Sequence, residues 1–134
     1  DGAATGKPSA DRTGVRRVSI RWYVGNANDD AGTNRGWLLG HFMSDEVRNT
    51  DAVEVKWGIH PAGQRRDGWM ATEQRTTLLL LISGRFRLDL PTGGVTLERQ
   101  GDYVVWEKGI DHSWQAEDDS TVITVRWPSW PVAP

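Results

Sequence analysis

The chain has 134 residues, and its 16 basic side chains nearly balance its 18 acidic ones, which gives a net charge of −2. This length fits one domain with one core. A near-neutral charge provides neither a basic field for nucleic acid nor a polybasic stretch for a membrane surface, so we expect neither partner. The sequence has no cysteine, which excludes disulfides, thiolate metal ligands and a cysteine nucleophile and is compatible with the cytoplasmic location that we expect.

The first residues differ in composition from the rest. Residues 1–14 are small and polar and contain Gly and Pro, so they cannot offset the entropy cost of becoming ordered. We predict a flexible tail over 1–14 and a single domain over 15–134. The tail lacks the apolar segment of a signal peptide, and no 18 apolar residues follow one another in the chain, so we expect no membrane span.

Short extended segments follow in chain order, separated by turn-forming residues. "PTGG" at 91–94 is a typical hairpin turn, because Gly accepts the positive φ that such turns need. Residues 26–36, "NANDDAGTNRG", are predicted to form a loop, and no window of 11 residues has the apolar period of a helix. The pattern predicts an all-β sandwich or barrel. The expected strands lie at 15–25, 37–43, 51–60, 71–90 with a bend at Gly84, 95–100, 103–107, 111–116 and 120–127.

The strand expected at 51–60 has an apolar and a polar face. Alternation leaves open which of them looks inward, although a face that carries a tryptophan is ordinarily buried. Lys56 is a candidate for substrate binding or proton transfer, and such a lysine needs burial to lower its pKa. The apolar face carries Val53, Val55, Trp57 and Ile59, and the polar face carries Glu54, Lys56, Gly58 and His60.

The run "LLLLI" at 78–82 has apolar side chains on both faces of its strand. Leu79 and Leu81 point one way, and Leu78, Leu80 and Ile82 point the other. Both faces should therefore be covered, the outer one by another sheet or by a second subunit. We expect a homodimer.

One segment resembles the second sequence motif of the cupin superfamily. That motif is Gly, five residues, Pro, one residue, Gly, two residues, His, three residues and Asn. Gly101, Gly109 and His112 fall at these spacings, whereas Glu107 replaces the proline and Ala116 replaces the asparagine. The resemblance implies a double-stranded β-helix, or jelly-roll barrel, as the fold.

The first cupin motif supplies three metal ligands in the family, as His, one residue, His, three or four residues, Glu, six residues and Gly. Counted back from Gly84, its ligand positions hold Ala71, Glu73 and Thr77. A catalytic metal in such a site usually needs two imidazoles and a carboxylate. We therefore expect no cofactor and no tightly bound metal. The side chains left for a weakly bound divalent metal are His112, Glu73 and either His60 or His41.

The resemblance also implies which side chains line the barrel. Glu73, Arg75 and Thr77 alternate onto one face, and His112 and Trp114 onto another, if both segments are regular strands. By resemblance both faces look inward, around an apolar pocket with few polar groups. His112 is the candidate acid or base, held by Glu73. Arg75 is the candidate clamp for a carboxylate or a phosphate, Trp114 a stacking wall and Thr77 a further substrate contact.

Each assignment has a structural alternative. His112 is equally an imidazole that only hydrogen-bonds inside the barrel, Glu73 and Arg75 an ion pair at the rim, and Trp114 a core residue. His41 lies among apolar neighbours and is interpreted as a core or interface histidine. The eight tryptophans can fill the barrel as readily as line it.

The residues favour a protein that binds a small molecule, such as a carboxylate. The first hypothesis is a metal-independent enzyme that transfers protons in an isomerisation, cyclisation or elimination on a small organic acid or secondary metabolite. The second is a non-catalytic binding or sensor protein. The third is a divergent metal-dependent dioxygenase or lyase.

Overall fold

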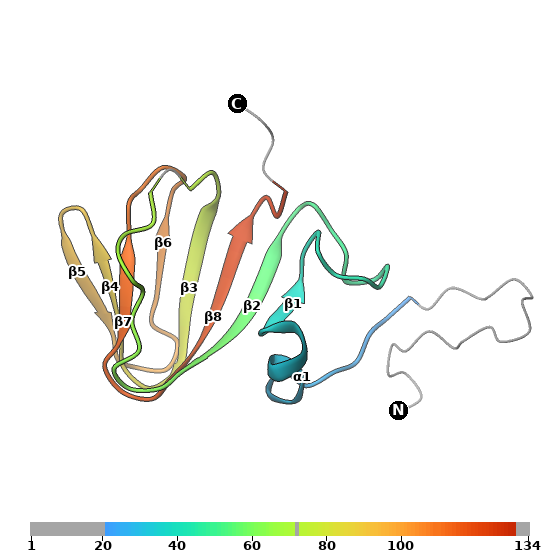
Figure 1. Cartoon of the computed structure of the whole chain (residues 1–134), viewed down its shortest axis with the longest axis horizontal. Helices are drawn as coiled ribbons and strands as arrows, with labels where there is room; N and C mark the ends of the chain where they lie inside the picture. Colours follow the sequence, from blue (N-terminus) through green and yellow to red (C-terminus); the bar gives the residue numbers. More distant parts are fainter. Residues whose placement is uncertain (1–20, 72, 131–134) are drawn as a thin grey trace, which may run out of the picture.

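The computed structural model describes residues 21–71 and 73–130, so the tail predicted over 1–14 lies outside the described residues. The described residues form one short helix and eight strands, shown in Figure 1. The elements are α1 (Ala27–Asn34), β1 (Trp37–Leu39), β2 (Glu54–His60), β3 (Thr76–Ser83), β4 (Phe86–Leu90), β5 (Gly93–Leu97), β6 (Tyr103–Trp106), β7 (Ser113–Ala116) and β8 (Ser120–Trp127).

The strands form two antiparallel sheets. The large sheet has the order β1-β2-β8-β3-β6, and the small sheet has the order β5-β4-β7. The last strand, β8, pairs with β2 on one side and with β3 on the other, so it lies in the middle of the large sheet. Figure 1 shows the small sheet beside the β6 and β3 half of the large one. The predicted all-β jelly-roll class is confirmed.

The core fills the space between the two sheets. Leu79 and Leu81 point inward from β3, and Phe86 and Leu88 point inward from β4. None of these four side chains is more than 5% exposed. Each such burial stabilises the fold by about 1.5–3 kcal/mol, so the core is held mainly by alternate residues of its central strands.

A tight turn joins β3 to β4 at Gly84, where the sequence predicted a bend. Gly84 has a φ of 99°, which side-chain-bearing residues rarely adopt. A Cβ atom at this position would also collide with the backbone of Asp119 and Ser120. The glycine is therefore required by the backbone rather than by the chemistry of a site.

The segment between β2 and β3 covers the free edge of β7. The backbone N–H of Arg66 donates to Trp114 O at 3.0 Å. Met70 and His112 exchange two backbone hydrogen bonds, of 2.7 and 3.1 Å, as an isolated antiparallel bridge. The open edge of the small sheet is thereby paired. We call residues 63–70 the edge segment.

The loop predicted at 26–36 is wrong, because Ala27–Asn34 form helix α1. The side chain of Asn26 accepts hydrogen bonds from the backbone N–H groups of Asn28 (2.9 Å) and Asp29 (3.2 Å). Such a cap satisfies donors that a helix start leaves free. α1 has eight residues and buries none of them, so it has no apolar period from which it could be predicted.

The first expected strand is also not observed where it can be checked. Residues 21–26 are not part of a strand, and residues 15–20 lie outside the described residues. The segment expected at 37–43 is a strand only over Trp37–Leu39. No helix in the described ranges is long and apolar enough to cross a membrane.

The polar face of β2 looks inward, contrary to the usual burial of a tryptophan face. Glu54 is 1% exposed, and Lys56, Gly58 and His60 line a cavity between the sheets. Ile59, on the opposite face, is 53% exposed. The physical reason is that the barrel interior at β2 holds a polar-lined cavity instead of packed apolar side chains.

Candidate functional site

A cavity of about 240 Å³ lies between the two sheets. Its apolar lining comes from core strands and includes Leu79, Phe86, Leu88, Trp106 and Val122. Its polar lining comes from β2, β3, β7, β8 and the edge segment. The remaining lining residues are Lys56, Gly58, His60, Arg66, Met70, Thr77, His112, Trp114, Thr124 and Arg126.

The lining carries positive but no negative side chains. Three cations line the cavity, Lys56 from β2, Arg66 from the edge segment and Arg126 from β8, and no Asp or Glu of the described residues is among the lining. Burial lowers the pKa of Lys56, and the charges of Arg126 and Arg35 act in the same direction. The charge of Glu54 acts against them, but the net shift is downward, so an anion beside Lys56 would be favoured.

His112 lies just before β7 and is buried inside the barrel. Its Nδ1 lies 3.1 Å from the carbonyl oxygen of Ile110. Because a carbonyl oxygen only accepts hydrogen bonds, Nδ1 carries the proton and Nε2 of the neutral ring keeps its lone pair. The ring packs against Trp106, with 4.7 Å between the ring centroids.

Several causes act on the pKa of His112. Burial lowers this pKa most strongly, the hydrogen bond to Ile110 opposes it, and the charges of Arg66 and Arg126 lower it further. Glu73 acts in the opposite sense to these arginines, but the net shift is downward. The imidazole is therefore neutral at neutral pH and able to accept a proton at Nε2.

His60 is a second imidazole in the same cavity, on the inward face of β2. Its Nδ1 lies 2.7 Å from Gln64 Oε1, which fixes the ring. Burial lowers the pKa of His60, the hydrogen bond to Gln64 raises it, and the charge of Lys56 lowers it. The sequence suggested this residue only as an optional metal ligand.

Aromatic rings form one wall of the cavity. Trp114 stacks on Phe86, with 5.3 Å between centroids and 25° between planes. His60 packs against Trp114 at 4.6 Å. The predicted wall residue Trp114 thus lies in the lining, half-buried and within a row of rings that presents flat faces.

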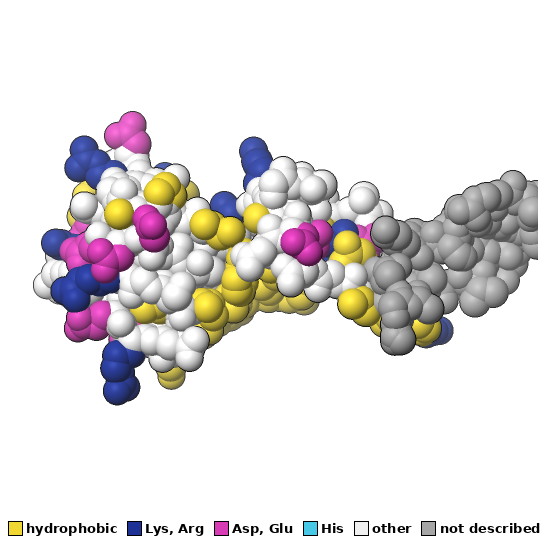
Figure 2. All heavy atoms as spheres, turned by 90° about the horizontal axis from the view of Figure 1, so that it is seen from below, with side chains coloured by type: hydrophobic (Ala, Val, Ile, Leu, Met, Phe, Trp, Pro, Cys, Tyr) yellow, Lys and Arg dark blue, Asp and Glu magenta, His cyan; other side chains and the backbone are white. Residues whose placement is uncertain are grey.

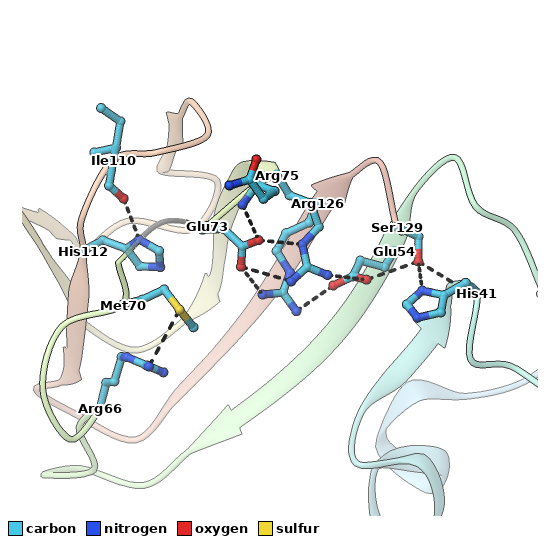
Figure 3. A network of polar contacts seen from close by, with 11 residues as sticks. His41, Glu54, Arg66, Met70, Glu73, Arg75, Ile110, His112, Arg126 and Ser129 are labelled. Atoms are coloured by element: carbon cyan, nitrogen blue, oxygen red, sulfur yellow. Dashed lines mark hydrogen bonds and ion pairs between the residues drawn. The ribbon is translucent and has the colours of Figure 1, made fainter. Parts of the chain in front are cut away.

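Glu73 and Arg75 do not line the cavity and belong to an ion cluster, seen in Figure 3, that reaches the cavity only through Arg126. Arg75 donates to both oxygens of Glu73, at 2.7 and 3.1 Å, and to Glu54 Oε1 at 3.1 Å. Arg126 lies 2.6 Å from Glu54 Oε2 and 3.6 Å from Glu73 Oε2. We call these four residues the ion cluster.

The ion cluster keeps Glu73 and Arg75 charged. Burial alone would raise the pKa of Glu73, but the hydrogen bond and charge of Arg75, together with Arg126, hold it below its usual range. Burial alone would lower the pKa of Arg75, but Glu73 and Glu54 raise it overall. Glu73 therefore contacts arginines instead of holding His112, and Arg75 is engaged by carboxylates of the protein itself.

The ion cluster continues away from the cavity to His41. Ser129 Oγ donates to Glu54 Oε1 at 3.2 Å and lies 2.7 Å from His41 Nδ1. Figure 3 shows His41 at the opposite end of this network from His112. The predicted interpretation of His41 as a packed histidine agrees with this position, because its ring also contacts Trp130 at 4.5 Å.

The residues do not fit a catalytic metal. The described parts of the chain hold no group of three or more His, Asp or Glu side chains that could bind one. Glu73 is engaged by Arg75 and Arg126, and the family's glutamate position holds Thr77. Two cations, Arg66 and Arg126, lower the pKa of His112 and oppose a further cation beside it.

Several buried donors in the cavity lining have no hydrogen-bond partner within the described part of the chain. They are the hydroxyl of Thr77, the Nε–H groups of Arg66 and Arg126, and the Nε1–H of Trp106. A buried donor left unpaired costs about 1–3 kcal/mol, so native proteins supply partners for nearly all of them. Each of these donors belongs to a residue of the cavity lining, so a ligand that carries acceptor oxygens is a candidate partner for them.

The sequence indicated part of this lining. His112, Trp114, Thr77 and Lys56 are lining residues. Arg126 was missed, although in "STVITVRW" it alternates onto the same face as Val122 and Thr124. Three further lining residues, Arg66, Met70 and Trp106, had no signal in the local pattern that distinguished them from loop or core positions.

No family model and no curated protein matches this sequence. Solved structures do match. KdgF from Halomonas sp. aligns with a TM-score of 0.53 and 22% identity over 59% of this chain and 71% of its own. An RmlC-like cupin from Shewanella frigidimarina aligns with a TM-score of 0.53 and 14% identity over 58% and 68%.

A cupin-2 domain-containing protein from Shewanella frigidimarina extends the match. It aligns with a TM-score of 0.52 and 17% identity over 78% of this chain and 94% of its own. The chain has the cupin fold, as the spacing of Gly101, Gly109 and His112 predicted. At these identities the likeness concerns the fold, and the chemistry must be argued from the cavity itself.

Proposed function

We propose that this cupin barrel binds a small organic anion, a carboxylate above all. The observation that carries the proposal is the composition of the cavity lining. Within the described residues, this lining has three cations and no acidic side chain, and four of its buried donors have no partner. A carboxylate offers two oxygens with about four acceptor sites, and arginine binds such a group through two parallel hydrogen bonds.

The volume limits the ligand to a small molecule. At about 30 Å³ for each water, a cavity of 240 Å³ has room for about eight waters. The row of Trp114, Phe86 and His60 favours a flat or unsaturated body, because aromatic faces stack on such groups. Small aromatic and 2-oxo carboxylates combine both properties.

We further propose that the bound anion undergoes proton transfer at His112. Nε2 of this neutral imidazole is free to accept a proton, while Nδ1 donates to Ile110. The nearby cations stabilise the negative charge that develops when a C–H bond next to a carbonyl loses its proton. His112 can then return the proton to another atom, as an isomerisation requires, or the carbanion can expel a leaving group.

A non-catalytic carrier or sensor is the second candidate, and the same observation supports it. The unpartnered donors account for anion binding without any reaction. The two functions differ in their dependence on His112, because a binding protein does not need the lone pair of Nε2.

Binding is tested first with benzoate and benzamide, which have the same shape but differ in charge. We expect calorimetry to give saturable binding of benzoate and at least tenfold weaker binding of benzamide. Equal affinity for the two, or no binding of benzoate and of a panel of 2-oxo acids, would refute the anion site. Proton NMR of a bound 2-oxo acid in D₂O then distinguishes an enzyme from a carrier, because only an enzyme accelerates the exchange of the C–H hydrogens next to the oxo group.

A further inference from the structure

The outer face of the large sheet is apolar across four neighbouring strands. Inward positions are occupied by core and cavity residues, so the alternate residues of β6, β3, β8 and β2 point outward. None of these outward residues is charged, and all lie within the described chain. They are Tyr103, Val105, Thr76, Leu78, Leu80, Ile82, Thr121, Ile123, Val125, Trp127, Val55, Trp57 and Ile59.

The outward residues stand in continuous rows across the sheet. Tyr103 pairs with Leu80, Leu80 with Ile123, and Ile123 with Trp57. Tyr103 is 62% exposed at the β6 edge, and Val105 beside it is 47% exposed. Figure 2 shows hydrophobic side chains gathered in a band along one side of the molecule, while charged side chains concentrate at one end. A charge-free face of this extent is unusual for a surface that faces water.

The opposite edge of the same face holds a groove. This outer groove, of about 510 Å³, lies between α1, β1 and β2. Ala27, Leu38 and Trp57 are among its apolar lining, and its two charged lining residues, Asp30 and Arg48, have opposite signs. The face thus has a projecting aromatic side chain at one edge and a hollow at the other.

We propose that a second copy of this chain covers the outer face, related to the first by a two-fold axis along β8. β8 is the central strand in the order β1-β2-β8-β3-β6. The axis is parallel to β8 and lies between the two facing sheets. Rotation about this axis brings the β6 edge of each copy over the β1 edge of the other, at the same height along the strands. Tyr103 of each copy then enters the outer groove of its partner, which is the self-complementary contact that a two-fold dimer needs.

The size of the face agrees with a stable dimer. The five strands of the large sheet have 3, 7, 8, 8 and 4 residues, and at about 3.3 by 4.8 Å for each residue they cover about 480 Å² in projection. A standard interface takes about 800 Å² of accessible surface from each partner. Upright side chains and the groove walls add the difference. The cavity, on the other side of the sheet, stays accessible.

The oligomeric state is tested by sedimentation of the full chain between about 1 and 100 µM, the range of moderate dimer affinities. We expect a dimer for the wild-type chain and at least tenfold weaker association for Val105→Lys. The matched control is Val95→Lys, an exposed valine of the small sheet, which should remain dimeric. Circular dichroism checks that both variants are folded. A monomeric wild type, or a dimer that Val105→Lys leaves unchanged, would overturn the proposal.

Cross-linking tests the geometry, because the chain has no cysteine of its own. Tyr103→Cys and Ala27→Cys are made separately and treated with a short bismaleimide, alone and mixed. We expect a cross-linked dimer from the mixture and little from either variant alone. A product from Tyr103→Cys alone would show that the two β6 edges lie together. No product from the mixture, although the variants are dimeric, would show that Tyr103 does not lie in the partner's groove. Either result would overturn the proposed axis.

Discussion

The barrel interior holds two polar regions that differ in how their hydrogen-bonding groups are used. In the ion cluster, Glu54 and Glu73 face Arg75 and Arg126 at 2.6 to 3.6 Å. In the cavity lining, Thr77, Trp106 and Arg66 carry buried donors without partners in the described chain. The first region satisfies its charges within the protein and serves the fold, whereas the second leaves donors for a ligand.

Arg126 belongs to both regions. Its two terminal nitrogens face the carboxylates of Glu54 and Glu73, while its side chain lines the cavity and its Nε has no partner in the described chain. The ion cluster therefore fixes the position of one cavity cation. Under the proposed function, the ligand would meet a guanidinium that is already held in place, which reduces the entropy lost on binding.

Breaking the ion cluster should have the largest effect on stability. Glu54→Gln leaves Arg75 and Arg126 without their shared carboxylate at a site that is 1% exposed. Removing one partner of a buried ion pair costs about 3–5 kcal/mol, which we expect as the loss in free energy of unfolding by urea denaturation. Glu98→Gln, in a solvent-exposed pair with Arg85, is the control and should leave the midpoint unchanged. An equal loss of free energy of unfolding in the two variants would contradict the structural role of the ion cluster.

His112→Gln should affect the reaction and spare the fold. If His112 is the base, the exchange of C–H hydrogens from a bound 2-oxo acid in D₂O slows by about 10²–10⁴-fold, the usual contribution of general acid–base catalysis. The affinity for benzoate changes little, because the arginines remain. NMR exchange rates and calorimetry measure the two quantities on the same sample. A parallel loss of both would assign His112 to binding or packing instead.

Arg66→Gln should weaken binding without a large loss of stability. Arg66 belongs to the cavity lining but not to the ion cluster, and its Nε has no partner in the described chain. Loss of one charge-assisted hydrogen bond of about 1.5–3 kcal/mol lowers the affinity for benzoate about tenfold or more. Arg87→Gln, on the exposed side of β4, is the matched control. An equal affinity for benzoate in the two variants would show that Arg66 does not contact the ligand.

The smallest expected effect concerns pH. The pKa values of His60 and His112 are lowered in the folded protein, mainly by burial. At a pH between these lowered values and the ordinary histidine pKa of about 6.5, the unfolded chain therefore binds more protons than the folded one. Stability is therefore full above pH 6.5 and decreases as the pH falls below it. Denaturation at pH 7.5 and 5.5 measures the difference, which His60→Gln with His112→Gln should reduce. If the double variant loses as much stability between pH 7.5 and pH 5.5 as the wild type, the loss belongs to other titratable groups.

The sequence predicted the fold through features that depend on local chemistry alone. Alternating strands, the turn at Gly84 and the spacing from Gly101 to His112 express backbone rules that hold in any context. α1 was missed because eight residues with a capping asparagine and no buried side chain carry no periodic signal.

The site was predicted only in part, for two physical reasons. Period-two alternation does not say which face of β2 looks inward, so Lys56 and His60 could not be placed. β3 begins at Thr76, so Glu73 and Arg75 precede the regular pleat that was assumed for them, and their positions follow from Arg126 and Glu54 on other strands. The catalytic roles, the absence of a metal, the cytoplasmic location and the small-molecule partner remain predictions.

The edge segment has a consequence for how this barrel can diverge. Its residues 63–70 are held against β7 largely through main-chain hydrogen bonds, which any non-proline residue can make. Arg66 and Met70 reach the cavity from this segment, so their replacement changes the ligand-facing chemistry while the pairing stays intact. New ligand preferences can therefore arise in descendants of this sequence by substitutions that the scaffold tolerates.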